Sequence, residues 1–287
     1  MKSTANAALQ KYQVPSVATY SCDVRTSLLA GNTDFHIHNH NELYFLIRGN
    51  IQYFVDSKCY PLTGGSLILF SEHEIHKALN MTAEPFTRLV IHVNSSFIRP
   101  YCTPRTNLLA CFQRIPGHGN LVNLSPEEIK KLLSLASELR SAQADPSAYG
   151  SDLTAISLLI RILVLVNLAW ERMPETEGTE IRYRSSEIME YIERHISEPL
   201  SLDSVAQALS MGKFYMSHLF KAETGSTVFQ YILVKRIAIA RSLLSEGVSV
   251  TEACERSGFN DYSNFIRSFR LITGTSPGQF RKHAGTP

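Results

Sequence analysis

Several titratable side chains lie close together near the start of the chain. The segment runs His36, Ile37, His38, Asn39, His40, Asn41 and Glu42, and His76 follows further along. Successive side chains of a strand alternate between its two faces, so His36, His38 and His40 are expected on one side. Imidazole and carboxylate groups that converge can hold a divalent metal, contact a polar small molecule, or serve only as packed structural residues.

Metal binding, contact with a polar ligand and structural packing all remain open as roles for these side chains, and we favour contact with a polar ligand. The expected ligand contacts are His36, His38, His40, Glu42, Tyr44 and His76. A metal such as zinc, iron, manganese or nickel would use His36, His38, Glu42 and His76, but no cofactor is expected. Aromatic residues of the same region could stack on a sugar face, although most are expected in the core: Tyr44, Phe45, Tyr53, Phe54 and Tyr60.

Short strands must position these side chains. Between about residues 18 and 93, apolar segments such as 42–47, 51–55 and 66–70 are separated by glycine-containing turns. Regularly spaced short strands of this kind are typical of a β-sandwich or a small barrel.

Two helices are expected after the strands. Ser125 and Pro126, followed by two glutamates, predict a capped helix start, and that helix should run to about Gln143. A second helix, 151–172, is apolar on most sides and must be broadly buried. It packs either on the barrel or against the same helix of a second subunit, with Asn167 setting the register. Its expected inner stripe is Leu153, Ile156, Ile160, Leu163, Val164, Asn167 and Leu168.

Bulk properties indicate an ordinary soluble protein with two domains. The chain has 287 residues, of which 44% are hydrophobic and 19% charged. Its 5 cysteines include no CxxC pair, which argues against a zinc finger and a disulfide framework. No secretory signal or comfortable membrane span is recognised, so a cytoplasmic location is expected. Hydrophobic periodicity disappears over 174–184, which predicts a linker between a domain at 1–173 and another at 185–287.

The C-terminal domain repeats itself. Residues 220–231 match residues 269–280 in type at most positions. Each copy predicts a short helix, a turn and a second helix, at about 201–225 and 250–274, with a long helix joining them. Ser210-Met211-Gly212 and Gly258 provide the turns. In a single unit of this kind, the polar outer face of the second helix is often only a surface exposed to solvent. Two matching units favour a protein that binds DNA with both units, each second helix lying in a major groove.

The outer faces of the two second helices differ. His218 of the first copy aligns with Arg267 of the second, and Lys221 aligns with Arg270. Arginine can donate two hydrogen bonds to guanine, so Arg267 is the strongest candidate for a base contact. Residues 181–287 carry 13 basic and 10 acidic groups, an excess that permits a nucleic-acid partner without demonstrating one. The expected DNA contacts are Phe214, Ser217, His218, Lys221, Tyr262, Ser263, Ile266, Arg267 and Arg270.

Residues 185–283 resemble the DNA-binding domain of the AraC/XylS family of transcription regulators. The matching segments are 219–225, 236–244, 258–265 and 274–281. The resemblance implies two helix-turn-helix units in successive major grooves and contact with RNA polymerase. It also implies base contacts at Phe214, Ser217, His218, Ser263 and Arg267. His218 departs from the arginine often found at its position, which puts a strong guanine contact by the first unit in doubt.

Residues 30–95 resemble the cupin family. His36, His38, Glu42 and Gly49 have the spacing of its first motif, and Gly65, His76 and Asn80 match the second, although Ser71 and His73 replace the usual proline and glycine. The resemblance implies an N-terminal jelly-roll barrel with flanking helices. The expected fold is therefore α+β with two domains, a cupin-like barrel followed by an all-α domain with two helix-turn-helix motifs.

These features predict a homodimeric, ligand-responsive transcription regulator, commonly an activator. Its partners would be double-stranded DNA, a carbohydrate-like effector and RNA polymerase, with no membrane. One alternative is a metal-dependent cupin enzyme with a regulatory DNA-binding tail. Another is a DNA-binding protein with no effector.

Overall fold

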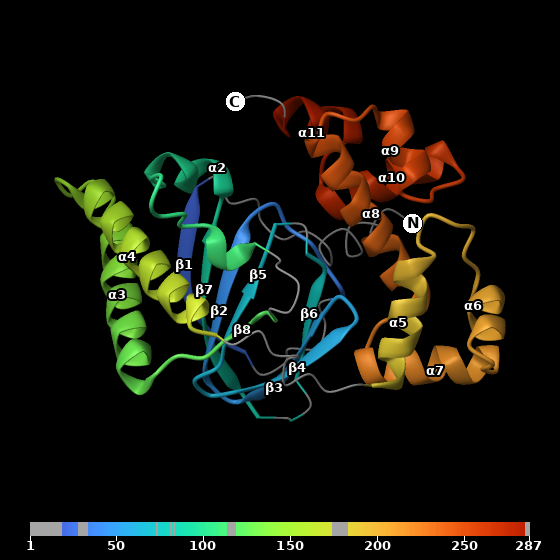
Figure 1. Cartoon of the computed structure of the whole chain (residues 1–287), viewed down its shortest axis with the longest axis horizontal. Coiled ribbons are helices and arrows are strands. Elements are labelled where there is room, and N and C mark those ends of the chain that lie inside the picture. The colour runs from blue at the N-terminus through green and yellow to red at the C-terminus, as the bar shows by residue number, and fades with distance from the viewer. Residues whose placement is uncertain are drawn as a thin grey trace.

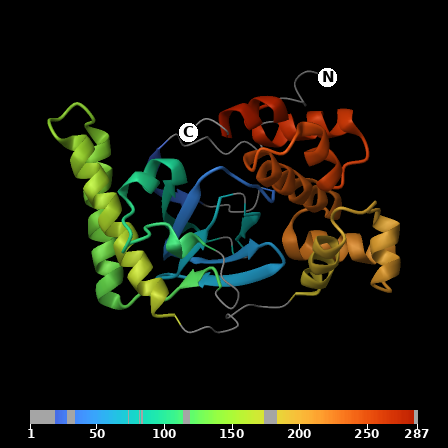
Figure 2. The same cartoon turned by 45° about the horizontal axis from the view of Figure 1, so that its top comes forward.

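The protein is built in four layers (Figure 1). Two long helices cover one sheet, a second sheet lies behind it, and the helices of the C-terminal half lie beyond that sheet; a turned view shows the same order (Figure 2). This computed structural model describes residues 19–27, 34–72, 74–80, 82, 84–113, 119–173 and 183–284. The expected linker at 174–184 lies almost entirely outside the described residues.

The N-terminal half contains two antiparallel sheets. The larger has the strand order β1-β7-β2-β5-β8, and the smaller has the order β4-β3-β6. Their strands are β1 (Tyr20–Ser27), β2 (Asn41–Arg48), β3 (Asn50–Val55), β4 (Lys58–Thr63), β5 (Leu67–Phe70), β6 (His76–Leu79), β7 (Phe86–Val93) and β8 (Leu121–Val122). The expected β-sheet domain with flanking helices is confirmed.

Alternation along each strand separates three cores. In β2, Tyr44 and Leu46 face the space between the two sheets, whereas Leu43 and Phe45 face the helices on the outer side of the larger sheet. In β3, Tyr53 faces the space between the sheets, and Phe54 faces the C-terminal helices. The smaller sheet therefore has one face inside the barrel and the other against the DNA-binding half.

Helices α3 (Pro126–Ala144) and α4 (Ser151–Glu171) form the outermost layer of the N-terminal half. The Ser125 hydroxyl accepts a hydrogen bond from the backbone N–H of Glu128, as the sequence predicted. The stripe expected on α4 was partly wrong, because Leu153, Val164 and Leu168 are exposed. Their exposure follows from the position of α3, which together with the sheet contacts a face of α4 that includes Leu159, Ile162 and Val166.

Asn167 serves its own subunit. Its side-chain oxygen accepts a hydrogen bond from the Cys111 backbone N–H (2.9 Å), and its amide donates to the Leu108 and Leu163 carbonyls (3.0 and 2.8 Å). The buried amide thus ties a loop to α4, which corrects the suggestion that Asn167 sets the register between subunits. By length and composition α4 could also cross a membrane, but its buried residues pack against α3 and the larger sheet.

The C-terminal half is helical, as expected. Its two helix-turn-helix units are α6 with α7 and α9 with α10, and α8 joins them. The second helices are 49 residues apart, but the first helices are only 48 apart, so the second turn is one residue longer. The bounds are α5 (Arg184–Arg194), α6 (Leu202–Ala208), α7 (Lys213–Thr224), α8 (Val228–Ser245), α9 (Val250–Arg256), α10 (Tyr262–Thr273) and α11 (Pro277–Ala284); the first half also has α2 (Ser95–Ile98) and the 3-10 turns η1 (Arg99–Tyr101) and η2 (Ala110–Phe112).

The two turns use different residues in the left-handed conformation. Ser210 has φ +53° in the first unit, and Gly258 has φ +86° in the second. Gly212, which the sequence suggested as the turn glycine, has φ −67° and precedes α7. A Cβ on Gly258 would lie 2.3 Å from the Ile196 carbonyl oxygen, so only glycine fits there.

We expect Gly258→Ala to destabilise the protein more than Gly247→Ala. Both residues have positive φ, and a side chain in that conformation costs roughly 1–2 kcal/mol. A Cβ added to Gly247 would meet no atom within 4 Å, whereas one added to Gly258 would also clash with Ile196, at a cost of about 1–3 kcal/mol more. Urea unfolding of the two variants measures the difference, and equal losses would contradict the role of the clash.

Candidate functional site

Helix α7 presents the expected reading face of the first unit. Phe214 is 82% exposed, and His218 and Lys221 are also exposed, whereas Ser217 is half-buried. Met216 and Phe220 lie on the opposite side, in the core. Gly225 ends the helix in the left-handed conformation. The outer residues therefore lie on one accessible face because the hydrophobic face is already occupied by the core.

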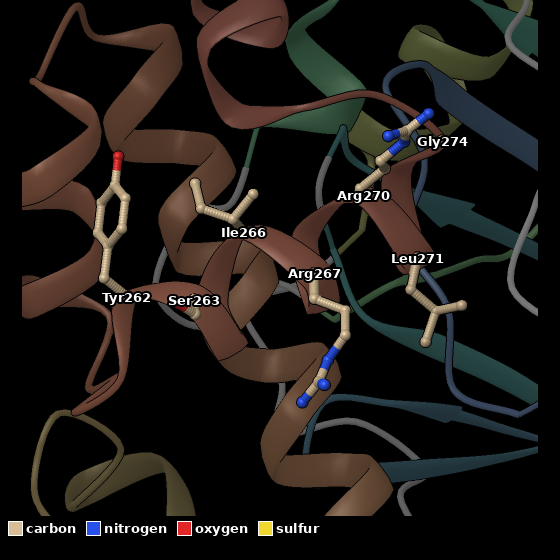
Figure 3. Close-up of a pocket in the computed structure, with 7 residues that line it drawn as sticks. All are labelled: Tyr262, Ser263, Ile266, Arg267, Arg270, Leu271 and Gly274. Carbon is tan, nitrogen blue, oxygen red and sulfur yellow. The ribbon is translucent and has the colours of Figure 1, made fainter.

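Helix α10 presents the corresponding face of the second unit. The Asp261 side chain accepts a hydrogen bond from the Asn264 backbone N–H (2.8 Å) and caps the helix. Arg267 and Arg270 extend away from the helix (Figure 3), and Arg267 donates to the Asn264 side-chain oxygen (3.1 Å). A hollow of about 790 Å³ lies along this face, lined by Tyr262, Ser263, Ile266, Arg267, Arg270, Leu271 and Gly274. The structure thus groups all the α10 residues that the sequence singled out.

A second group of polar residues lies inside the barrel. Glu42 lies on the same face of β2 as Tyr44, and its carboxylate Oε2 is the common neighbour of three imidazoles. The Nε2 atoms of His38, His76 and His92 lie 2.9, 3.7 and 3.4 Å from it, respectively. The carboxylate and the His38 and His76 rings are buried, whereas the His92 side chain is 13% exposed.

His92 was not among the residues singled out from the sequence. It lies on β7 and is directly paired with Glu42 of β2. Its Nδ1 lies 3.1 Å from the Ser21 hydroxyl. The available signal was a lone histidine in an apolar strand, but the pairing that brings it to Glu42 is not visible in local sequence.

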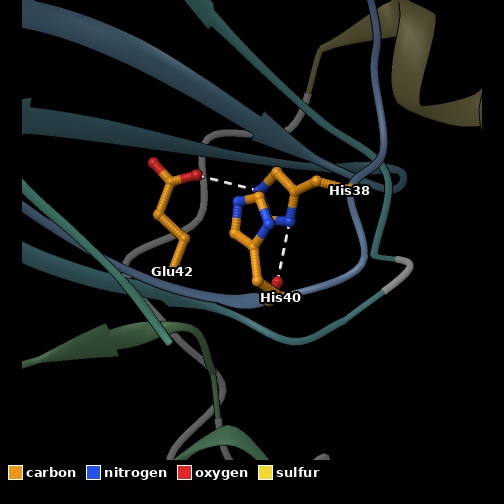
Figure 4. A group of neighbouring side chains, drawn as sticks. All are labelled: His38, His40 and Glu42. Atoms are coloured by element: carbon orange, nitrogen blue, oxygen red, sulfur yellow. Dashed lines mark hydrogen bonds and ion pairs between the residues drawn. The ribbon is translucent and has the colours of Figure 1, made fainter. Parts of the chain in front are cut away.

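The histidines of the first segment occupy different positions. The His38 and His40 rings stack with centroids 3.9 Å apart (Figure 4). Potential ligand atoms of His38, His40 and Glu42 all lie within 4.8 Å of one another. The His36 ring lies 4.4 Å from that of His76 but 6.3 Å from that of His38. His36 is therefore at the margin of the group, which is centred on Glu42.

Several polar atoms in this group are buried without a hydrogen-bond partner. They are both ring nitrogens of His40, Nε2 of His76 and the hydroxyl of Tyr44. Unpaired buried polar atoms are costly, so their accumulation makes this group the candidate ligand site of the barrel. The other aromatic candidates, Phe45, Tyr53, Phe54 and Tyr60, are buried in the cores, as expected for most of them.

Burial and neighbouring charges set the protonation of the group. Burial and then His38 and His92 lower the pKa of His40 to about 2, and burial holds that of His76 well below its ordinary value. Burial would raise the pKa of the Glu42 carboxyl, but hydrogen bonds from His38 and His92 hold it well below its ordinary value. The group therefore combines the Glu42 carboxylate with the neutral imidazoles of His40 and His76, which can hydrogen-bond a polar ligand.

A buried polar contact joins the barrel to the DNA-binding half. The Lys77 ammonium of β6 donates to the Ser226 hydroxyl (2.8 Å), which donates to Asp34 (3.1 Å). The Gln230 amide of α8 also donates to Asp34 (3.2 Å). We call Asp34, Lys77, Ser226 and Gln230 the interdomain contact. His76 precedes Lys77 in the same strand, so adjacent residues reach the histidine group and this contact.

Comparisons with known proteins agree with this architecture. Residues 30–163 match the AraC-like ligand binding domain, and residues 205–283 match a helix-turn-helix domain. Together the two matches cover most of the chain. The families concerned are transcription regulators and not enzymes, which sets aside the cupin-enzyme alternative.

Similar proteins include activators of the same organisation. The transcriptional activator RhaS of Enterobacter sp. (strain 638) is 22% identical over 251 residues, covering 86% of this chain and 87% of that protein. The activator RhaR of Salmonella schwarzengrund (strain CVM19633) is 23% identical over 256 residues, covering 86% of each chain. A fatty-acid-bound ToxT structure from Vibrio cholerae strain SCE256 is 14% identical, with coverage of 94% and 97% and a TM-score of 0.39. By its two matched domains, the chain belongs to the AraC family of ligand-responsive, DNA-binding transcription regulators.

Proposed function

We propose that the chain is a sequence-specific activator that reads DNA with α7 and α10. The observation that supports this most strongly is the exposure of the outer residues on both second helices while their inner faces are held in one core. Each helix can then enter a major groove, and α8 fixes their separation. The proposed contacts are Phe214, Ser217, His218, Lys221, Tyr262, Ser263, Ile266, Arg267 and Arg270.

The two units are proposed to differ in how they read. Arg267 is exposed and offers the bidentate donor geometry that distinguishes guanine. His218, at the matching position, has fewer donors, and Phe214 offers only apolar contact. The second unit would therefore supply more of the base discrimination, and Lys221 and Arg270 would contact phosphates.

Arg267→Ala should weaken binding to the selected DNA site by roughly 5-fold to 150-fold, since a bidentate base contact is worth about 1–3 kcal/mol. Binding to random DNA should change much less. Sites selected from a random library, followed by titrations on selected and random duplexes, provide the measurement. Arg256→Ala is the matched control, because Arg256 is exposed on α9 and paired with Glu252. Equal losses on both duplexes would rule out the base contact.

The effector is proposed to be a small polar metabolite such as a sugar, bound beside the histidine group. The unpartnered His40 nitrogens and Tyr44 hydroxyl are buried hydrogen-bonding atoms that hydroxyl groups could satisfy. His36, His38, Glu42 and His76 line the same region. A DNA-binding protein without an effector remains the competing proposal.

A bound sugar at 100 times its dissociation constant should stabilise the protein by about 2.7 kcal/mol. This corresponds to a rise of about 5–10 °C in melting temperature, at roughly 2–4 °C per kcal/mol for a chain of this size class. Thermal melts of the full chain against a panel of sugars and sugar acids test this. The shift should disappear in His40→Ala and persist in His218→Ala, which lies on the exposed face of α7. No shift with any sugar or sugar acid would remove support for a carbohydrate effector.

Signal transmission is proposed to pass through the interdomain contact. A ligand that moves His76 also moves the adjoining Lys77, and Lys77 is hydrogen-bonded to Ser226 at the end of the first helix-turn-helix unit. Ligand response requires that the ligand bind two arrangements with different affinity, and this contact is where those arrangements would differ.

Ser226→Ala should lower the free energy of unfolding by about 1–3 kcal/mol, because it removes a buried hydroxyl that both accepts from Lys77 and donates to Asp34. Amide hydrogen exchange along β6 should also become faster. Thr275 occupies the equivalent place in the second unit but is exposed, so Thr275→Ala should change stability by no more than about 0.5 kcal/mol. If the two variants behave alike, Ser226 does not hold the domains together.

The remaining elements of the proposal rest on family membership and on the relatives' names. RhaS and RhaR are named transcriptional activators, which supports activation. Contact with RNA polymerase is proposed from the family resemblance alone. We further propose a cytoplasmic homodimer, with residues 1–173 sensing the ligand and forming the dimer, 174–184 as linker and 185–287 binding DNA.

A further inference from the structure

We propose that Arg241 of α8 binds a carboxylate group of the effector, so that the ligand contacts both halves of the protein at once. Arg241 is buried, with an exposed fraction of 4%, and its Nε has no hydrogen-bond partner. A buried charge that is left unpaired strongly destabilises a protein. The inference rests on the proposed small-molecule effector and specifies the chemistry of that ligand.

The other two cationic side chains of α8 find their partners within the protein. Lys235 donates to the carboxylates of Asp56 and Glu193 (2.6 and 3.1 Å). Arg236 donates to two backbone carbonyls of its own half (3.1 and 2.7 Å). Arg241 is more deeply buried than either of them and yet has an unpaired donor. An anion from outside the chain would supply what the protein does not.

Arg241 is close to both α11 and the barrel. Its guanidinium carbon lies 5.2 Å from the centroid of the Phe280 ring in α11. Burial lowers the pKa of Arg241 to about 10, so the side chain stays charged at neutral pH, and the Glu72 carboxylate partly offsets this lowering. Burial and neighbouring histidines lower the pKa of His40, and the charge of Arg241 adds to the effect. The guanidinium is therefore within electrostatic reach of the barrel end where His40 lies.

Glu72 makes no ion pair with Arg241, because its hydrogen bonds hold it to the barrel. Its Oε1 accepts from the Ser95 backbone N–H (3.0 Å), and its own N–H donates to the Asn41 side chain (3.3 Å). Glu72 nevertheless supplies one negative charge nearby. A singly charged ligand group therefore fits better than a phosphate ester, which carries about 1.5–2 negative charges. The planar donors of arginine also match the two oxygens of a carboxylate.

The barrel supplies neutral groups for the rest of the ligand. Both ring nitrogens of His40 and the hydroxyl of Tyr44 are buried without a partner. A ligand hydroxyl can donate to one such atom and accept from another. One arginine beside neutral hydrogen-bonding groups thus favours a sugar acid over a neutral sugar. Because α8 joins the two helix-turn-helix units, a ligand held by Arg241 would bias their position relative to the barrel directly.

Titration calorimetry on the full chain tests the preference for an acid. The ligands are hexoses and pentoses, their matching aldonic and uronic acids, and the simple acids acetate and pyruvate. Wild type should bind a sugar acid at least roughly tenfold more tightly than the matching neutral sugar, as expected for hydrogen bonds to a charged group. Arg241→Gln should lose this preference and keep the affinity for the neutral sugar.

Two further variants separate ligand binding from a structural role. Arg236→Gln is the matched control, since Arg236 lies on the same helix but is bonded within its own half, and it should retain the preference for the acid. Without ligand, Arg241→Met should unfold at the same urea concentration as wild type or at a higher one, because an apolar side chain replaces an unpaired buried charge. A lower midpoint would show that the protein itself holds the guanidinium, and the proposal would fail.

The titrations distinguish failure of this inference from failure of the sugar effector. Neutral sugars that bind as tightly as their acids, or a preference for acids that survives in Arg241→Gln, would overturn the role of Arg241 and leave the carbohydrate effector intact. Binding of acetate or pyruvate alone, lost in Arg241→Gln, would uphold the carboxylate site and contradict a sugar. No binding by any of these ligands would overturn both.

Discussion

The burial of Lys77 and Asp34 is the constraint on which the arrangement of the two halves depends. Both groups belong to the barrel half, and both are buried against the C-terminal helices. A charged group removed from water must find hydrogen-bonding partners, and here Ser226 and Gln230 of the DNA-binding half provide them. Separating the halves would expose apolar surface and break the hydrogen bonds of Lys77 and Asp34 to Ser226 and Gln230, so that water would have to replace these partners. The hydrogen bonds therefore fix how the two halves are positioned relative to each other. Apolar packing adds to the contact, since Phe35 packs edge-on against Tyr231 beside it.

Strand alternation turns this contact into a connection with the barrel interior. His76 and Lys77 are consecutive, so one points toward Glu42 and the other toward Ser226. The segment containing Asp34 and His36 runs alongside, held by two backbone hydrogen bonds between His36 and His76. A change at the histidine group must therefore be accommodated in two paired segments that also carry the interdomain contact. This geometry places the histidine group and the interdomain contact on the same two paired segments.

The repeated units have diverged in what they contact. Ser226 of the first unit is buried against the barrel, whereas Thr275, its counterpart, is exposed. Each is preceded at two residues by a threonine whose hydroxyl makes the same local hydrogen bonds, so the helix ends are alike. Similar interiors thus support different tasks: the first unit anchors the DNA-binding half to the barrel, and the second carries Arg267. The two copies are alike where their own cores require it and different where they meet other surfaces.

The sequence determined the features that depend on neighbours along the chain. The capped start of α3, the paired helix-turn-helix units and the outward position of Arg267 follow from spacing of three to four residues and from capping chemistry. The tertiary structure alone decided the pairing of His92 with Glu42, the internal bonding of Asn167 and the exposure of Leu168. These depend on strand register and on which neighbour covers a helix. Such contacts join residues far apart in the chain, so no local pattern specifies them.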